Sequence, residues 1–271
     1  MSMTVVVEDV TPSIAKDWLD RNSDSQRKVR QGIVDRYARD MLNGKWALTH
    51  QGIAFDCKGK VIDGQHRLWA IVNSGVTVKM VVVRNSPSDA FDHVDLGYGR
   101  TASDVLKAQG DAWIQNEHIA MARYMEFGAD SKAIVTNRSP FELRTLVEAH
   151  KNAIHFVLQN KERSVRGVTI APVLAAIGVA YYHEMDRVRL ADFVRLLVSG
   201  VAQDPARDSI VIKLREWLRD TSGQTGSTAR IEAFLKTQRV IKAYMNEENL
   251  TKIYTPSETI YNTIKKAMIK D

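Results

Sequence analysis

Asp63-Gly64-Gln65-His66-Arg67 stands between a short, mostly apolar run at residues 60–62 and the helical pattern of residues 68–72. This order predicts a strand that passes through a glycine turn directly into a helix. The first N–H groups of a helix can bind a ligand, and the helix dipole favours negative charge at that end. We therefore predict an anion site, where Gly64 lets a phosphate approach the backbone and Arg67 clamps it.

Each side chain of this turn has a chemical role and a structural alternative. Arg67 is the candidate phosphate clamp, and otherwise forms a salt bridge across the domain. His66 could donate to a phosphate or transfer a proton, and Gln65 could orient a water molecule or contact the phosphate. Asp63 could hold magnesium through water or serve as a base, or it could cap the helix. Asp63 and His66 are thus the candidate catalytic residues, and Asp63 is the candidate metal ligand.

Two further segments carry cations that could meet a phosphate. Arg27, Lys28 and Arg30 precede a predicted helix and could face nucleotide phosphates or DNA, although a solvated basic face is the more common arrangement. Arg100 and Thr101 follow a turn with two glycines, which is a weak form of a phosphate-cradling loop. We take the first three as candidate nucleic-acid contacts and the last two as candidate cofactor contacts.

Composition sets the class of the protein. The 271 residues are 44% hydrophobic and carry a net charge of +6, which suits a globular chain of one large or two small domains and permits nucleic-acid contact. The only cysteine is Cys57, so no intramolecular disulfide forms, as suits a reducing cytoplasm. We expect no membrane span, because no run of 18 apolar residues occurs, and the N-terminus reads as a first strand rather than a signal peptide.

Periodicity and turn signals predict an α+β organisation. We expect strands at residues 5–7, 52–55, 60–62 and 78–83, with helices from Thr11-Pro12 and over 29–42 and about 65–74. From residue 101 onward the pattern is almost wholly helical, with expected helices at 101–109, 112–127, 139–160, 169–184, 187–199, 205–220, 228–246 and 256–270. We place a domain over 1–110, a helical domain over 111–271, and a flexible linker at 221–227.

Five prolines follow a capping residue, which is the usual start of a helix. These pairs are Thr11-Pro12, Ser86-Pro87, Ser139-Pro140, Asp204-Pro205 and Thr255-Pro256. The pairs at 139 and 255 are also followed by glutamate in the spacing of a capping box. We therefore predict helix starts at all five positions.

The predicted elements and their motifs resemble the N-terminal domain of the ParB/sulfiredoxin superfamily over about residues 4–106. The chain is most similar to the phage and mobile-element proteins with a DGQHR-type motif, often labelled ParB-like nucleases. The motifs that carry the resemblance are Gly44-Lys45-Trp46 and the stretches 52–56, 63–70, 74–76, 95–97, 100–102 and 104–106. The resemblance implies a ParB/sulfiredoxin-like mixed α/β domain, followed here by an all-helical C-terminal region.

Members of this superfamily hold a nucleotide phosphate at the strand–helix turn, with differing chemistry. Sulfiredoxins use a cysteine where this chain has Gln65, and Cys57 lies eight residues earlier, which argues against thiol-based repair. ParB proteins bind CTP through a Gly-Glu-Arg-Arg motif. The corresponding stretch here keeps the glycine as Gly64 and the last arginine as Arg67, but it has no acidic residue at the second position. Free-serine kinases with Gly-His-His-Arg are closer at His66-Arg67. The resemblance implies ATP or CTP as cofactor, with Mg²⁺ as a further candidate.

Three functions follow as hypotheses. The first is a nucleotide-binding ParB-like protein of phage or mobile-element origin, which binds or hydrolyses a nucleoside triphosphate and acts with DNA in the cytoplasm. The second is an enzyme, either a kinase-like phosphotransferase or a nuclease, because Asp63 and His66 lie near the expected phosphate. The third is a DNA-binding regulator without catalysis. A homodimer is compatible with all three.

Overall fold

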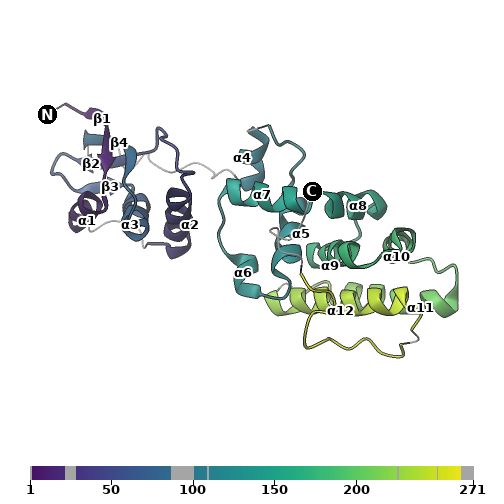
Figure 1. Ribbon diagram of the computed structural model, residues 1–271. Coiled ribbons are helices and arrows are strands. Elements are labelled where there is room, and N and C mark those ends of the chain that lie inside the picture. The colour runs from purple at the N-terminus through teal and green to yellow at the C-terminus, as the bar shows by residue number, and fades with distance from the viewer. Residues whose placement is uncertain are drawn as a thin grey trace. The chain divides into compact units, whose positions relative to one another are not determined.

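The computed structural model describes residues 2–21, 29–86, 101–108, 110–224, 226–248 and 250–263, which form four strands and twelve helices (Figure 1). The expected mixed α+β class is confirmed. The chain divides into two compact units. Unit 1 comprises Met1–Arg100 with Asn137–Phe141, and unit 2 comprises Thr101–Thr136 with Glu142–Asp271. No helix of the described ranges is long and apolar enough to cross a membrane.

Unit 1 is built on a four-stranded sheet with the order β1-β4-β2-β3. The strands are β1 (Thr4–Val10), β2 (Ile53–Asp56), β3 (Val61–Asp63) and β4 (Val78–Ser86). The central strand β4 runs antiparallel to β1 and parallel to β2, and β2 forms a hairpin with β3. The Asp56 carboxylate closes this hairpin by accepting the backbone N–H groups of Lys58 and Lys60, both at 2.8 Å. The hairpin expected from the turn signal is thereby confirmed.

Three helices pack with the sheet of unit 1: α1 (Pro12–Asp20), α2 (Gln31–Leu42) and α3 (Gln65–Ser74) (Figure 1). Their apolar stripes bury a single core with the inward residues of the strands. The largest contributions come from Trp18, Met41, Ile53, Phe55, Leu68, Ile71 and Met80. The helices and strands expected within the described residues of this unit are confirmed to within a few residues of their ends.

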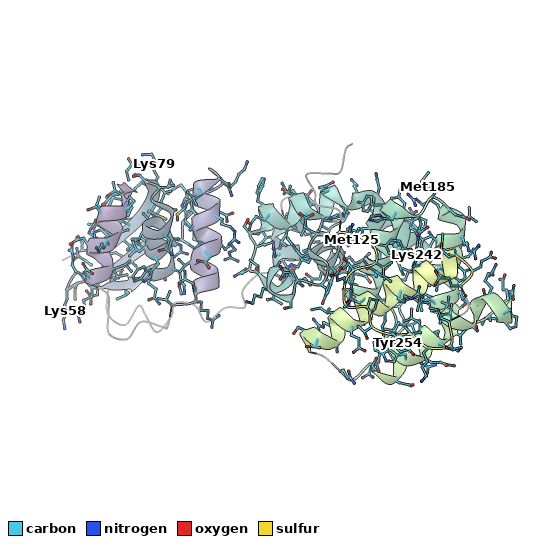
Figure 2. The ribbon with its side chains drawn as sticks, turned by 60° about the horizontal axis from the view of Figure 1, so that its bottom comes forward. Lys58, Lys79, Met125, Met185, Lys242 and Tyr254 are labelled. Carbon is cyan, nitrogen blue, oxygen red and sulfur yellow. The ribbon has the colours of Figure 1, made fainter. Side chains whose placement is uncertain are left out.

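Unit 2 is helical and packs around one buried helix. Its elements are α4 (Ala102–Ala108), α5 (Asn116–Phe127), α6 (Ser131–Val135), α7 (Pro140–Ala149, from Glu142 onward), α8 (Lys151–Lys161), α9 (Ala171–His183), α10 (Arg187–Ser199), α11 (Pro205–Asp220) and α12 (Ser227–Met245). Helix α9 is apolar on every side and buried from Pro172 to Ala180. A side chain at Gly178 would lie 2.8 Å from the sulfur of Met125, which Figure 2 shows inside this unit. Small residues on α9 therefore let α5 approach closely.

Three of the five predicted proline starts are confirmed. Thr11 and Asp204 accept backbone N–H groups of the first turns of α1 and α11, and α7 begins at Pro140. Ser86 ends β4, and Pro87 lies outside the described residues. Thr255-Pro256 begins no helix in the described residues that follow it, so this prediction was wrong.

The predicted helix at 256–270 is absent from its described part, residues 256–263, because distant groups take the bonds that a helix needs. The Thr255 hydroxyl donates to the Glu232 carboxylate at 3.0 Å. The backbone N–H groups of Ile260 and Tyr261 both donate to Oε1 of the buried Gln238, at 3.0 and 3.3 Å, and Gln238 Nε2 donates to the Tyr261 carbonyl. Residues 250–263 are therefore held as an irregular strap on α12.

Replacing Gln238 with methionine should release this strap. The substitution keeps the shape of the side chain and removes its three bonds to Ile260 and Tyr261, at an expected cost of about 2 kcal/mol in unfolding free energy. Hydrogen exchange at the amides of Ile260 and Tyr261 should accelerate. Gln224→Met, at an exposed turn, is the control. Unchanged exchange at Ile260 and Tyr261 in Gln238→Met would contradict the role of this side chain.

Other boundaries in unit 2 also differ from the prediction. The expected helix 139–160 is two helices, α7 and α8, which are separated at the buried His150. The expected helix 112–127 begins only at Asn116, after a turn that buries Ile114, and the short helix α6 was not expected. Residues 221–224 form a turn between α11 and α12, which lie in the same unit.

Candidate functional site

The predicted glycine turn has the expected local form. β3 ends at Asp63, Gly64 follows with φ of 99°, and α3 begins at Gln65. Only glycine adopts this left-handed conformation without strain. The turn is also closely packed, because a Cβ at Gly64 would lie 2.6 Å from Ile53 Cδ1 and 3.0 Å from the Gly52 carbonyl oxygen. The fold itself therefore requires glycine here, because Ile53 and Gly52 fill the space that a side chain would take. The predicted approach of a phosphate to this backbone stays a prediction.

Arg67 ties α3 to the residues before β2. Its Nη1 donates to the Gly52 carbonyl at 3.0 Å and its Nη2 to Gln51 Oε1 at 3.1 Å, and the side chain is only 13% exposed. Asp63 Oδ2 lies 3.8 Å from Nη1, while Asp63 Oδ1 accepts the Gly64 N–H at 2.7 Å. Arg67 thus has structural hydrogen bonds, and its ion pair among the described residues is the local one with Asp63 rather than a salt bridge across the domain. Its role as a phosphate clamp stays a prediction. Within the described residues, these bonds use two of the five guanidinium N–H groups.

His66 joins the starts of two helices. The backbone N–H of Arg30 donates to His66 Nε2 at 3.0 Å, across 36 positions of sequence. Arg30 is the N-cap of α2 and Gly64, which has no side chain, is the N-cap of α3; the Arg30 side chain forms no capping hydrogen bond with the described residues of α2. The positive ends of α2 and α3 therefore meet at this bond, and the Arg30 side chain beside it is exposed.

The other predicted site residues have separate outcomes. Gln65 is buried, at 5% exposure. Thr101 belongs to unit 2, where its hydroxyl and backbone N–H bond the Asp104 carboxylate at 2.6 and 2.9 Å at the start of α4. Arg27, Lys28 and Arg100 lie outside the described residues. Of the predicted residues outside the turn, Arg30 is the one that the structure places beside it, through the bond from its N–H to His66.

Within the turn itself, residues 63–67, a magnesium ion would have one carboxylate, that of Asp63, which is 45% exposed. No group of three or more His, Cys, Asp or Glu side chains that could hold a metal occurs among the described residues. One carboxylate suits Mg²⁺ only where phosphates and water complete the shell, as they do in nucleotide complexes. The donor set fits a nucleotide-borne metal and does not form a protein-only site.

Sequence reasoning missed Gln51 and Gly52 as partners of Arg67. A backbone carbonyl leaves no trace in residue type, so no pattern could have identified Gly52 as an acceptor. The only sequence signal was the glycine itself, which stands directly before a predicted strand. Its function is steric, since a Cβ at Gly52 would lie 1.7 Å from the Val81 carbonyl oxygen.

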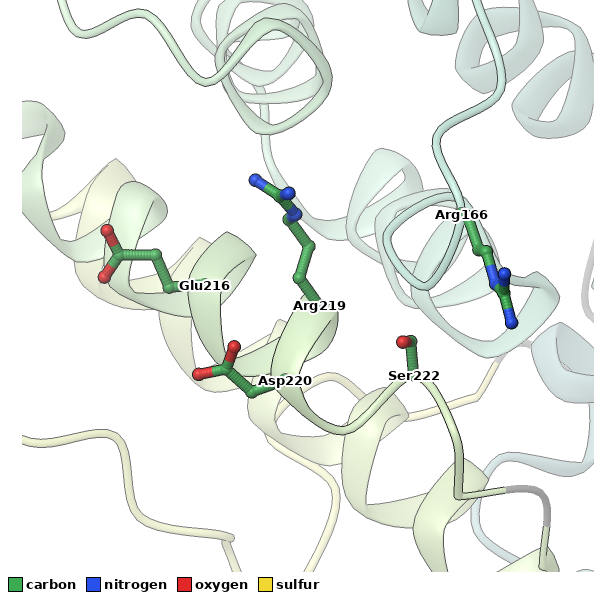
Figure 3. A pocket seen from close by; sticks show the side chains of 5 residues that line it. All are labelled: Arg166, Glu216, Arg219, Asp220 and Ser222. Atoms are coloured by element: carbon green, nitrogen blue, oxygen red, sulfur yellow. The ribbon is translucent and has the colours of Figure 1, made fainter.

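A second hollow, in unit 2, has a volume of about 610 Å³ and is lined by Arg166, Glu216, Arg219, Asp220 and Ser222 (Figure 3). All five side chains are exposed. Figure 3 shows them spread around the hollow rather than directed at one point. Its two cations and two carboxylates balance, so it has no net preference for an anion, and we do not regard it as the functional site.

Comparison with known proteins found no match to any family model, to any curated protein or to any solved structure. The case for a site at the Asp63–Arg67 turn consequently rests on the geometry of α2 and α3.

Proposed function

We propose that unit 1 binds the phosphates of a nucleoside triphosphate, ATP or CTP, where the N-termini of α2 and α3 meet. The observation that carries this proposal is the bond from the Arg30 N–H to His66 Nε2. It holds two helix starts side by side, and each contributes roughly half a positive charge and N–H groups that point outward. The protein would be a ParB-like protein of phage or mobile-element type that acts with DNA.

Three neighbouring groups support phosphate binding. Arg30 adds an exposed cation at the junction. Arg67 has N–H groups beyond the two that bond Gln51 and Gly52, and these bonds fix its guanidinium in place. Gly64 lets β3 pass directly into α3, which places the N-terminus of α3 at this junction. Together they provide the mixture of backbone and arginine donors that recognises phosphate.

The contacts favour binding over proton transfer by His66. Because Nε2 accepts the Arg30 N–H, this nitrogen is already used and does not serve as a base. His66 instead acts as a positioning residue that sets the spacing of α2 and α3. Asp63 is the group that would meet a Mg²⁺ ion carried by the nucleotide.

The test is isothermal titration of the full chain with ATP, CTP and GTP in the presence of Mg²⁺. We expect saturable binding that Arg30→Gln weakens about tenfold, since a hydrogen bond between charged groups contributes about 1.5 kcal/mol or more. Lys79→Gln is the matched control, because it removes one exposed cation that pairs with Asp9 elsewhere on unit 1 (Figure 2). The proposal fails if no nucleotide binds, or if the two variants bind equally well.

The DNA part of the proposal rests on the net charge of +6 and the exposed Arg30. Gel shifts over a series of salt concentrations test it, because phosphate contacts give an affinity that falls steeply with salt. Phosphate release measured in the same samples distinguishes hydrolysis from binding alone. DNA binding that does not change with salt would contradict a contact to DNA phosphates. Nucleotide binding would then still be decided by the titration.

A further inference from the structure

Unit 2 contains a cavity of about 530 Å³ whose only charged lining residues, among those described, are two arginines. Arg123 comes from α5 and Arg230 from α12, and no aspartate or glutamate is among the described residues of the wall. Asn116 and Ser227, the first residues of α5 and α12, also line it, so the positive ends of two long helices face the cavity. The described wall therefore carries positive potential without a compensating carboxylate.

Arg123 is held in a setting that an anion would stabilise. Burial lowers the pKa of its guanidinium, and within the described chain it forms no ion pair. Its Nη1 donates to the Ile134 carbonyl at 3.2 Å, while its buried Nε has no hydrogen-bond partner among the residues that the structure describes. A partly buried cation without a counter-charge is less stable than a solvated one, and an incoming oxyanion would offset that cost.

A second cavity, of about 410 Å³, borders the first and shares Ala120, Tyr124 and Arg230 with it. The rest of its described wall includes the apolar Ile170, Pro172, Trp217 and Leu218 beside the polar Thr221, Ser222 and Gln224. Burial raises the pKa of Tyr124, and the neighbouring Arg230 partly offsets this rise. A ligand that fills both spaces would place an anion at the arginines and an apolar, preferably flat, body toward Trp217.

We propose that this pair of cavities binds an amphipathic small molecule, with an oxyanion held by Arg123 and Arg230 and an apolar body seated toward Trp217. The total volume lies in the range of small-molecule sites. The hollow of Figure 3 provides the contrast, because its two arginines are balanced by two carboxylates. The site is in unit 2 and does not depend on nucleotide binding by unit 1.

The test uses three probes on the full chain by isothermal titration: 2-naphthyl phosphate, 2-naphthol and inorganic phosphate. We expect 2-naphthyl phosphate to bind at least tenfold more tightly than either of the others. Arg123→Gln and Arg230→Gln should each weaken that binding about tenfold or more. Arg219→Gln, which removes an exposed arginine of the same unit, should leave it unchanged. Arg30→Gln should also leave it unchanged, which separates this site from the one proposed in unit 1.

Two results would overturn the proposal. One is 2-naphthol binding as tightly as 2-naphthyl phosphate, which would mean that the arginines do not recognise the phosphate group. The other is unaltered binding in both arginine variants. Arg230→Gln provides the check on folding, since it keeps the bond from Arg123 to the Ile134 carbonyl and removes only the hydrogen bond of Arg230 to the Tyr124 hydroxyl. Circular dichroism and the melting temperature of each variant establish that it is folded before titration.

Discussion

Replacing Gly52 with alanine is expected to destabilise unit 1 by at least about 3 kcal/mol, near the upper end of what overpacking usually costs. The new Cβ would lie 1.7 Å from the Val81 carbonyl oxygen and 2.6 Å from the Val81 carbonyl carbon. Both atoms belong to the backbone of β4, the central strand, so no side-chain rotation relieves the contact. The pairing of β2 with β4 must shift instead, and Gly52 also provides the carbonyl that Arg67 bonds.

Urea unfolding followed by circular dichroism measures this effect. Gly59→Ala is the matched control in the same unit. Gly59 has φ of +76°, but a Cβ there would have no atom of the described residues within 4 Å, so alanine meets only backbone strain of about 1 kcal/mol. If Gly52→Ala unfolds at the same urea concentration as Gly59→Ala, then the approach of Gly52 to β4 is not a constraint on the fold.

Local signals predicted the elements of this chain wherever the groups involved lie within a few residues of one another. Thr11 and Asp204 cap helices because the N–H groups that they accept are two or three residues away. Gly75 ends α3 in the left-handed conformation for a similarly local reason. The αL turn at Gly64 belongs to the same class, since the change from β3 to α3 can be read in five consecutive residues.

Features that depend on distant partners could not be predicted from the pattern. The capping-box form at Thr255 fails because Glu232 and Gln238, on α12, take the bonds that would start a helix. At the candidate site, the approach of Arg30 to His66 joins groups 36 positions apart. The sequence showed Arg30 and the glycine turn separately, and only the packing of α2 on α3 shows that Arg30 lies beside the turn.

His150 also depends on partners that are distant in the sequence. Its replacement by leucine is expected to cost about 2–3 kcal/mol, because buried polar groups lose a hydrogen-bond partner. His150 is fully buried at the break between α7 and α8. Its Nε2 lies 3.3 Å from Glu126 Oε2, and its Nδ1 lies 3.3 Å from the Tyr182 hydroxyl. Leucine would leave the buried Glu126 without this imidazole.

Tyr182, the second partner of His150, stabilises this buried site as a neutral group. Burial raises the pKa of Tyr182 to about 12, with a smaller contribution from Tyr181, so its hydroxyl stays protonated across the usual pH range. Tyr182→Phe therefore removes a single neutral hydrogen bond and should cost about 1 kcal/mol. The expected order of destabilisation is His150→Leu above Tyr182→Phe.

Chemical denaturation of single and double variants tests the pair. The double variant His150→Leu with Glu126→Leu should be more stable than the sum of the two single effects predicts, because it removes both polar partners together. His155→Leu, on the same helix α8 with its ring against Trp113, is the control and should cost about 1 kcal/mol or less. If His150→Leu were as mild as His155→Leu, the polar contacts would not stabilise the break between α7 and α8, and the turn at His150 would have to follow from the packing of the two helices alone.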